Sequence, residues 1–243
     1  MDVEQVMELL RAQADPARLA GMARYAIRTG SRYGLSMVDL RRLAKELPKE
    51  HALALDLWCT GNAEARILAS MLAEVELASS AQLDEWAADF DSWDVCDQVC
   101  DNLFMHTRFA WDKVREWSKR EEEYVRRAAF ALLACLAWHD KSARDAQFIE
   151  SFTLIKGSAN DGRNFVKKAV NWALRNIGKR NMMLNAAAIT CAQELLESGE
   201  RTAGWIARDA LRELQGAKMQ QRLAAKESRQ IVKESGRISP RRE

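Results

Sequence analysis

The chain has 243 residues, of which 48% are hydrophobic, 30% charged and 7% aromatic. This composition excludes a disordered or fibrous protein, and the length suffices for a stable core without disulfides. With 37 basic and 35 acidic residues, the formal net charge is only +2. The total is not that of a strongly basic nucleic-acid binder, so a charged partner must be met by a local patch.

The predicted elements are almost all helical, because Ala, Leu, Glu, Arg and Lys dominate and almost no window alternates with a period of two. Capping signals at Asp15-Pro16, Ser36–Asp39 and Ser79–Gln82 mark helix starts. In chain order, helices are predicted roughly over residues 2–13, 16–28, 36–46, 49–59, 62–73, 80–90, 93–104, 107–118, 121–138, 142–155, 162–178, 182–198 and 202–215. Short helices that pair at intervals of about 35 to 40 residues predict stacked two-helix repeats of the HEAT or armadillo kind.

We therefore expect an all-α solenoid with a concave basic cleft, formed by a single domain over residues 1–215. A polar, basic tail over residues 216–243 is expected to be a loosely attached helix that frays near Pro240.

The N-terminal segment MDVEQVMELL is an amphipathic helix pattern and not a signal peptide. The longest apolar run, Ala128 to Trp138, has 11 residues and predicts a buried helix, because a bilayer span needs about 20. The five cysteines are expected to be reduced thiols and not a disulfide framework: Cys59, Cys96, Cys100, Cys135 and Cys191. The protein is therefore expected in the cytoplasm, with the nucleus as the alternative. Cys96 and Cys100 favour core packing over zinc, and neither metal nor cofactor is expected.

Charge is unevenly distributed along the chain. Residues Glu46 to Asp101 include 13 acidic and two basic side chains, whereas Lys156 to Arg180 include seven basic and one acidic. The tail from Gly216 has eight basic and three acidic residues. A solenoid could thus carry one basic surface and one acidic back, although solvated helix faces would give the same counts.

The segment NFVKKAVNWALRNIGKRN places Lys168, Arg175 and Lys179 on one helix face, with Trp172 at the border of the apolar arc. Such an indole could offer its ring to a ligand while the cations hold phosphates. The alternative is a tryptophan at the core edge, covered by the stems of Lys and Arg.

Two further helices carry complementary charges. In SWDVCDQVCDNLF, Trp93 and Asp97 share the edge of the apolar arc and could face a cation. The alternative, a favourable charge at the helix N-terminus, accounts for Asp94 better than for Asp97. In EYVRRAAFALLACLAW, Arg127 either pairs with a buried carboxylate or reaches into a cleft.

These three segments, with RYGLSMVDLRRLAKEL and EARILASMLAE before them, resemble the AlkD-type DNA alkylation repair proteins, which are built of HEAT-like repeats. The likeness runs from about residue 20 to 215. It matches the family's site residues to Trp93, Asp97, Arg127 and Trp172. Where the best-known members carry two successive tryptophans, this chain has Ser92-Trp93, which implies a less fully lined cleft.

The resemblance implies a monomeric, monofunctional DNA glycosylase that removes cationic alkylpurines, such as N3-methyladenine and N7-methylguanine, from duplex DNA without base flipping. Asp97 would stabilise an oxocarbenium-like state and orient a water, and Trp93 and Trp172 would flank the deoxyribose. Arg127 would hold the DNA backbone near the lesion. The cations lining the groove against phosphates would be Lys168, Arg175, Lys179 and Arg180.

Two other functions remain open from the sequence, since HEAT-like surfaces also serve for binding alone. One is a non-catalytic solenoid that binds distorted or branched DNA. The other is a protein–protein scaffold whose working surface is the acidic stretch from Glu46 to Asp101.

Overall fold

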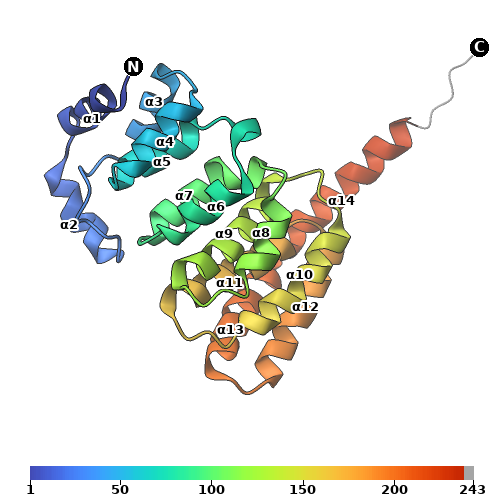
Figure 1. Cartoon of the computed structure of the whole chain (residues 1–243). Helices are drawn as coiled ribbons and strands as arrows, with labels where there is room; N and C mark the ends of the chain where they lie inside the picture. Colours follow the sequence, from blue (N-terminus) through green and yellow to red (C-terminus); the bar gives the residue numbers. More distant parts are fainter. Residues whose placement is uncertain (238–243) are drawn as a thin grey trace, which may run out of the picture. The chain divides into compact units, whose positions relative to one another are not determined.

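The computed structural model describes the chain from residue 1 to residue 237 and its side chains up to Arg229. Over that range every regular secondary-structure element is a helix (Figure 1). The helices are α1 (Val3–Ala12), α2 (Pro16–Arg24), α3 (Met37–Glu46), α4 (His51–Cys59), α5 (Ala63–Leu72), α6 (Ser80–Ala88), α7 (Trp93–Asn102), α8 (Ala110–Trp117), α9 (Glu123–His139), α10 (Asp145–Ser158), α11 (Asn164–Gly178), α12 (Met182–Glu197), α13 (Arg201–Leu214) and α14 (Ala217–Arg237), with short 3-10 turns η1 (Val75–Leu77) and η2 (Phe104–His106).

Each predicted helix is present with boundaries shifted by a few residues, so the all-α prediction is confirmed. The capping signals act as expected: Asp15 caps α2 and Ser36 opens α3 with a capping box. The largest difference is α2, which ends at Arg24 and not near residue 28. Ala26 adopts a left-handed φ of 56°, which a continuing helix does not allow.

The chain divides within α9 into two compact units, a first unit of Met1–Leu132 and a second unit that begins at Leu133. The single repeat domain over residues 1–215 and the concave basic cleft stay predictions. Residues 217–237 of the expected tail form α14, whereas the fraying predicted near Pro240 lies outside the described residues.

The first unit supports α7 through an aromatic core. The rings of Trp58 and Trp86 stack with centroids 4.0 Å apart, and Phe90 lies edge-on to Trp58 at 6.0 Å. The ring centroids of Phe90 and Trp117 lie 6.1 Å and 5.5 Å, respectively, from that of Phe104. Because Phe90 precedes α7 and Phe104 follows it, the core anchors the helix at both ends.

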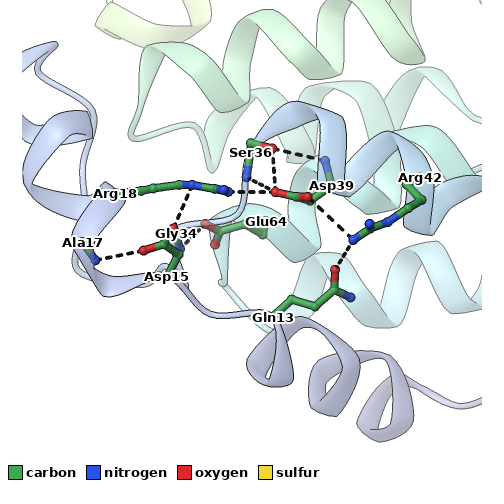
Figure 2. Close-up of polar contacts among 9 residues, drawn as sticks. All are labelled: Gln13, Asp15, Ala17, Arg18, Gly34, Ser36, Asp39, Arg42 and Glu64. Atoms are coloured by element: carbon green, nitrogen blue, oxygen red, sulfur yellow. Dashed lines mark hydrogen bonds and ion pairs between the residues drawn. The ribbon is translucent and has the colours of Figure 1, made fainter.

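Asp39 is the centre of a polar network at the start of α3, drawn in Figure 2. Its carboxylate accepts hydrogen bonds from the Ser36 hydroxyl (2.6 Å) and from Nη1 of Arg18 (2.8 Å). The Ser36 hydrogen bond, followed by that of Arg18, lowers the pKa of Asp39 from its ordinary 3.8 to about 2. The network thus ties α2 to α3 through an ionised carboxylate.

A buried carboxylate holds the loop that precedes α3. Glu64 of α5 is fully buried, and its oxygens accept the backbone N–H groups of Tyr33 (3.2 Å) and Gly34 (2.9 Å); Figure 2 includes Gly34 and Glu64. Gly34 has a φ of 88°, and a Cβ there would lie 2.3 Å from the Asp15 carbonyl oxygen. Only glycine fits this close approach.

The second unit stacks helices in pairs, as the repeat prediction requires. Helix α10 packs against α11 and α12, and α13 packs against α11 and α12. Residues 128–137 of α9 are all buried, which confirms the expected buried helix. Trp138 is the exception, because its side chain is 44% exposed. Within the described residues, no helix is long and apolar enough to cross a membrane.

Candidate active site

Asp97 of α7 and Arg127 of α9 form a bidentate ion pair. Nε of Arg127 donates to Oδ1 at 3.0 Å, and Nη2 donates to Oδ2 at 2.8 Å. The side chains are only 14% and 6% exposed, respectively. Because a guanidinium has donors only, this geometry fits the ionised carboxylate. Of the two alternatives for Arg127, the structure shows pairing with a buried carboxylate.

The surroundings of Asp97 act against its charge. Burial is the largest influence and raises the pKa of Asp97, and the nearby carboxylates of Asp94 and Asp101 act in the same direction. The charge and hydrogen bonds of Arg127 oppose that rise. Arg127 therefore both orients Asp97 and favours its ionised form.

Trp93, the first residue of α7, lies beside this pair. Its indole N–H donates to the carbonyl oxygen of Tyr25 at 3.0 Å, which fixes one edge of the ring. The Cζ atom of Arg127 lies 5.8 Å from the ring centroid, within the range of a cation–π contact. The first unit thus brings together three of the predicted site residues: Trp93, Asp97 and Arg127.

Ser92, where the resemblance seen in the sequence would place a second tryptophan, is an internal residue. It is 1% exposed, its hydroxyl donates to Oδ1 of Asp94 at 2.5 Å, and it accepts the backbone N–H of Arg28 at 3.3 Å. Asp94 also pairs with the buried side chain of Arg32 at 2.6 Å. These bonds fasten the loop after α2 to the start of α7. The contacts with Arg28 and Arg32 join residues about 60 positions apart, so no local pattern in the sequence indicates them.

The second unit holds Trp172, half-buried on α11, and the four predicted DNA-binding cations. Lys168 is exposed and, within the described residues, forms no ion pair. Arg175 pairs with Asp209 at 2.8 Å, and Glu213 lies 2.6 Å from Arg175 and 2.7 Å from Lys179. Carboxylates of α13 therefore offset the positive charges of Arg175 and Lys179.

Arg180 caps the end of α9. Its Nη1 donates to the carbonyl oxygens of Ala137 and Asp140, both at 2.8 Å, and Nη2 reaches that of Ala143 at 3.3 Å. A cation at a helix C-terminus satisfies carbonyls that have no partner within the helix. The guanidinium of Arg180 is thus held by main-chain oxygens, and its assignment to DNA phosphates stays a prediction.

The thiols of α7 are part of the core. Cys96 and Cys100 are both fully buried, as predicted, whereas Cys59 is exposed. Among the side chains that the structure describes, no group of three or more His, Cys, Asp and Glu residues could hold a metal ion.

The fold and the site define a helical-repeat protein with a buried carboxylate–guanidinium pair beside a tryptophan. The chain belongs to the DNA alkylation repair enzyme family, whose sequence model matches residues 6–214. The resemblance seen in the sequence is therefore confirmed.

One solved structure similar to this chain belongs to a protein described as a member of "a new family of proteins related to the HEAT-like repeat DNA glycosylases with affinity for branched DNA structures". The two share a TM-score of 0.72 and 20% sequence identity, over 80% of this chain and 83% of that chain. At this identity the likeness shows the fold, which confirms the HEAT-like class. No curated protein sequence matches the chain.

Proposed function

We propose that this protein is a monofunctional DNA glycosylase that hydrolyses the N-glycosidic bond of cationic alkylpurines, such as N3-methyladenine and N7-methylguanine, in duplex DNA. It acts as a monomer and needs no base flipping. The observation that carries the proposal is the Asp97 carboxyl group, held by two hydrogen bonds from Arg127 beside the ring of Trp93.

The chemistry of the substrate matches this arrangement. An alkylated purine is already cationic, so the base leaves as a neutral molecule and positive charge develops on the sugar. A preorganised carboxylate stabilises that charge without reorganising during the reaction. Each oxygen of Asp97 accepts one hydrogen bond from Arg127 and retains capacity for another, so Asp97 can also orient the attacking water.

The aromatic rings serve the same cationic sugar. Trp93 has a ring fixed at its N–H edge and offers π-density to the developing charge. Trp172 is proposed, from the family resemblance, as the second aromatic contact of the deoxyribose. Its half-buried position on α11 leaves part of the indole accessible to a ligand.

DNA contacts follow from the exposed cations. Lys168 is the strongest candidate for a phosphate contact, because it is exposed and unpaired within the described residues. Arg175 and Lys179 contribute less, since Asp209 and Glu213 offset their charges. Arg127 is also proposed to hold the DNA backbone near the lesion.

The test is release of free base from duplex DNA that contains N7-methylguanine, measured by chromatography. The wild type is expected to release the base, and Asp97→Asn to lower the rate about 10²- to 10³-fold. Asp112→Asn is the matched control, because it removes the same charge from an exposed side chain of α8 and should retain the full rate. The proposal is wrong if the wild type releases no alkylpurine or if Asp97→Asn retains the full rate.

A second candidate function is non-catalytic binding of branched DNA. It is favoured by the likeness to the solved protein, whose family is described as having affinity for branched DNA structures. Four-way junctions and methylated duplexes should then be compared in one binding assay. Tight junction binding without release of any base would favour this candidate over the glycosylase.

A further inference from the structure

A cavity of about 700 Å³ lies wholly within the second unit, among the end of α9, the start of α12 and the side of α14. This volume is typical of small-molecule and cofactor sites. Its lining includes aromatic, thioether and cationic side chains: Trp138, Met183, Lys141, Arg180, Arg222 and Lys226. The proposed reaction at Asp97 uses none of them except Arg180.

The charge of this cavity is predominantly positive. Lys141, Arg222 and Lys226 line it and, within the described part of the chain, form no ion pair. The lining carboxylates are Asp145, which already accepts a hydrogen bond from Asn181 at 2.8 Å, and Glu227. Cations therefore outnumber carboxylates around the opening, and an anion would complete the site.

The pKa values of two lining lysines are lowered in this surrounding. Burial lowers the pKa of Lys141 and of Lys226, and repulsion from Arg180 and Arg222 adds to the effect on both. A bound anion would relieve that repulsion. The first residues of α12, including Met182, also line the cavity and bring the positive end of a helix dipole to it.

An aromatic ring and a thioether complete the lining. Trp138 is 44% exposed although the ten residues before it are buried, and Met183 is 55% exposed. The Cζ atom of Arg222 lies 5.7 Å from the Trp138 ring centroid. The ammonium groups of Lys141 and Lys226 donate to the carbonyl oxygens of Trp138 and Arg180, and each has further N–H groups for an anion. An accessible indole beside such cations is the combination with which proteins stack a base and hold its phosphate.

We propose that this cavity binds one nucleotide unit of a single DNA strand, with the base against Trp138 and a phosphate held by Lys141, Arg222 and Lys226. A free nucleotide has the same chemistry, and a strand is favoured because the chain belongs to a family of DNA repair enzymes. The binding needs neither a damaged base nor the carboxylate of Asp97, so it is tested separately from the glycosylase reaction.

The probe is a fluorescently labelled, undamaged thymidine oligonucleotide of about eight residues, whose binding is followed by anisotropy over a range of salt concentrations. Arg222→Ala/Lys226→Ala is expected to weaken binding at least about tenfold. The slope of log affinity against log salt should fall by about 0.7, the value for one lost phosphate contact on a single strand. Lys218→Ala is the matched control, because Lys218 is exposed on the same helix but does not line the cavity. It should bind within about twofold of the wild type.

Stacking is tested with Trp138→Leu and with an abasic oligonucleotide of the same length. Each change alone should weaken binding about tenfold, and the two together should weaken it no further, because both remove the same contact. Thymidine monophosphate and inorganic phosphate serve as competitors, and both should compete poorly.

Three outcomes would overturn the proposal. One is wild-type affinity of the Arg222→Ala/Lys226→Ala variant. Another is an equal loss in Lys218→Ala, which would indicate only a long-range field. The third is competition by thymidine monophosphate as strong as that of the oligonucleotide, which would assign the cavity to free nucleotides. Circular dichroism of each variant checks that the fold is intact.

Discussion

Asp97 and Arg127 lie 30 residues apart in the sequence and meet as a bidentate ion pair between α7 and α9. The proposed catalytic carboxylate is therefore also part of the packing of the first unit. Any substitution of Asp97 changes the environment of a buried guanidinium, so stability and catalysis must be measured together.

Removing one partner of this pair should destabilise the fold more than removing both. Arg127→Met leaves a buried carboxylate without its counter-charge and is expected to lower the free energy of unfolding by about 3 kcal/mol. Asp97→Asn/Arg127→Met leaves no buried charge at either position and should recover most of that loss, while base release stays at least as slow as in Asp97→Asn. Urea unfolding of the wild type, both single variants and the double variant measures the coupling. Additive losses would contradict a coupled pair.

Lys168 and Arg175 should separate DNA binding from stability. Lys168→Ala is expected to lower the salt slope of duplex binding by about 0.9, the value for one phosphate contact, with unchanged stability. Arg175→Ala should instead cost about 1 kcal/mol of stability, because Asp209 and Glu213 each lose one ion-pair partner. Filter binding over a salt series and thermal unfolding distinguish the two. A salt slope lowered equally by Arg175→Ala would assign Arg175 to phosphates, as the family resemblance implies.

Asp39 should make the stability depend on pH in the acid range. Its pKa is about 2 in the folded chain and near 3.8 when unperturbed, so the unfolded state binds its proton first as the pH falls. The stabilisation is complete above about pH 4 and is lost as the pH drops toward 2. Asp39→Asn should therefore be less stable than the wild type at pH 7, and the difference should vanish near pH 2. Chemical unfolding at several pH values tests this, and a difference that persists at pH 2 would count against it.

Ser92 should tolerate neither loss of its hydroxyl nor the tryptophan of other family members. Ser92→Ala leaves the Arg28 N–H without its acceptor and should cost about 1 kcal/mol. Ser92→Trp forces a large ring into a site that is 1% exposed and should cost about 3 kcal/mol or more, without a gain in base release. Thermal melts and the base-release assay give both readouts. A stable Ser92→Trp variant with faster release would show that this position faces the substrate.

The sequence by itself determined the helices, their caps and the positions that share a helix face. Trp93 and Asp97 lie on one edge of α7, and residues 128–137 of α9 are buried, as the periodicity predicted. These features depend on interactions between residues three or four apart, which a single segment contains.

Only the tertiary structure decided which partner each charge has. The seven cations between Lys156 and Arg180 suggested a basic face, yet Asp209 and Glu213 of α13 pair with two of them, and carbonyls at the end of α9 hold Arg180. Arg127 likewise had two possible roles until α7 brought Asp97 to it. The physical reason is that these ion pairs and the Arg180 cap join segments 30 or more residues apart, and helical periodicity carries no information about which segments pack together.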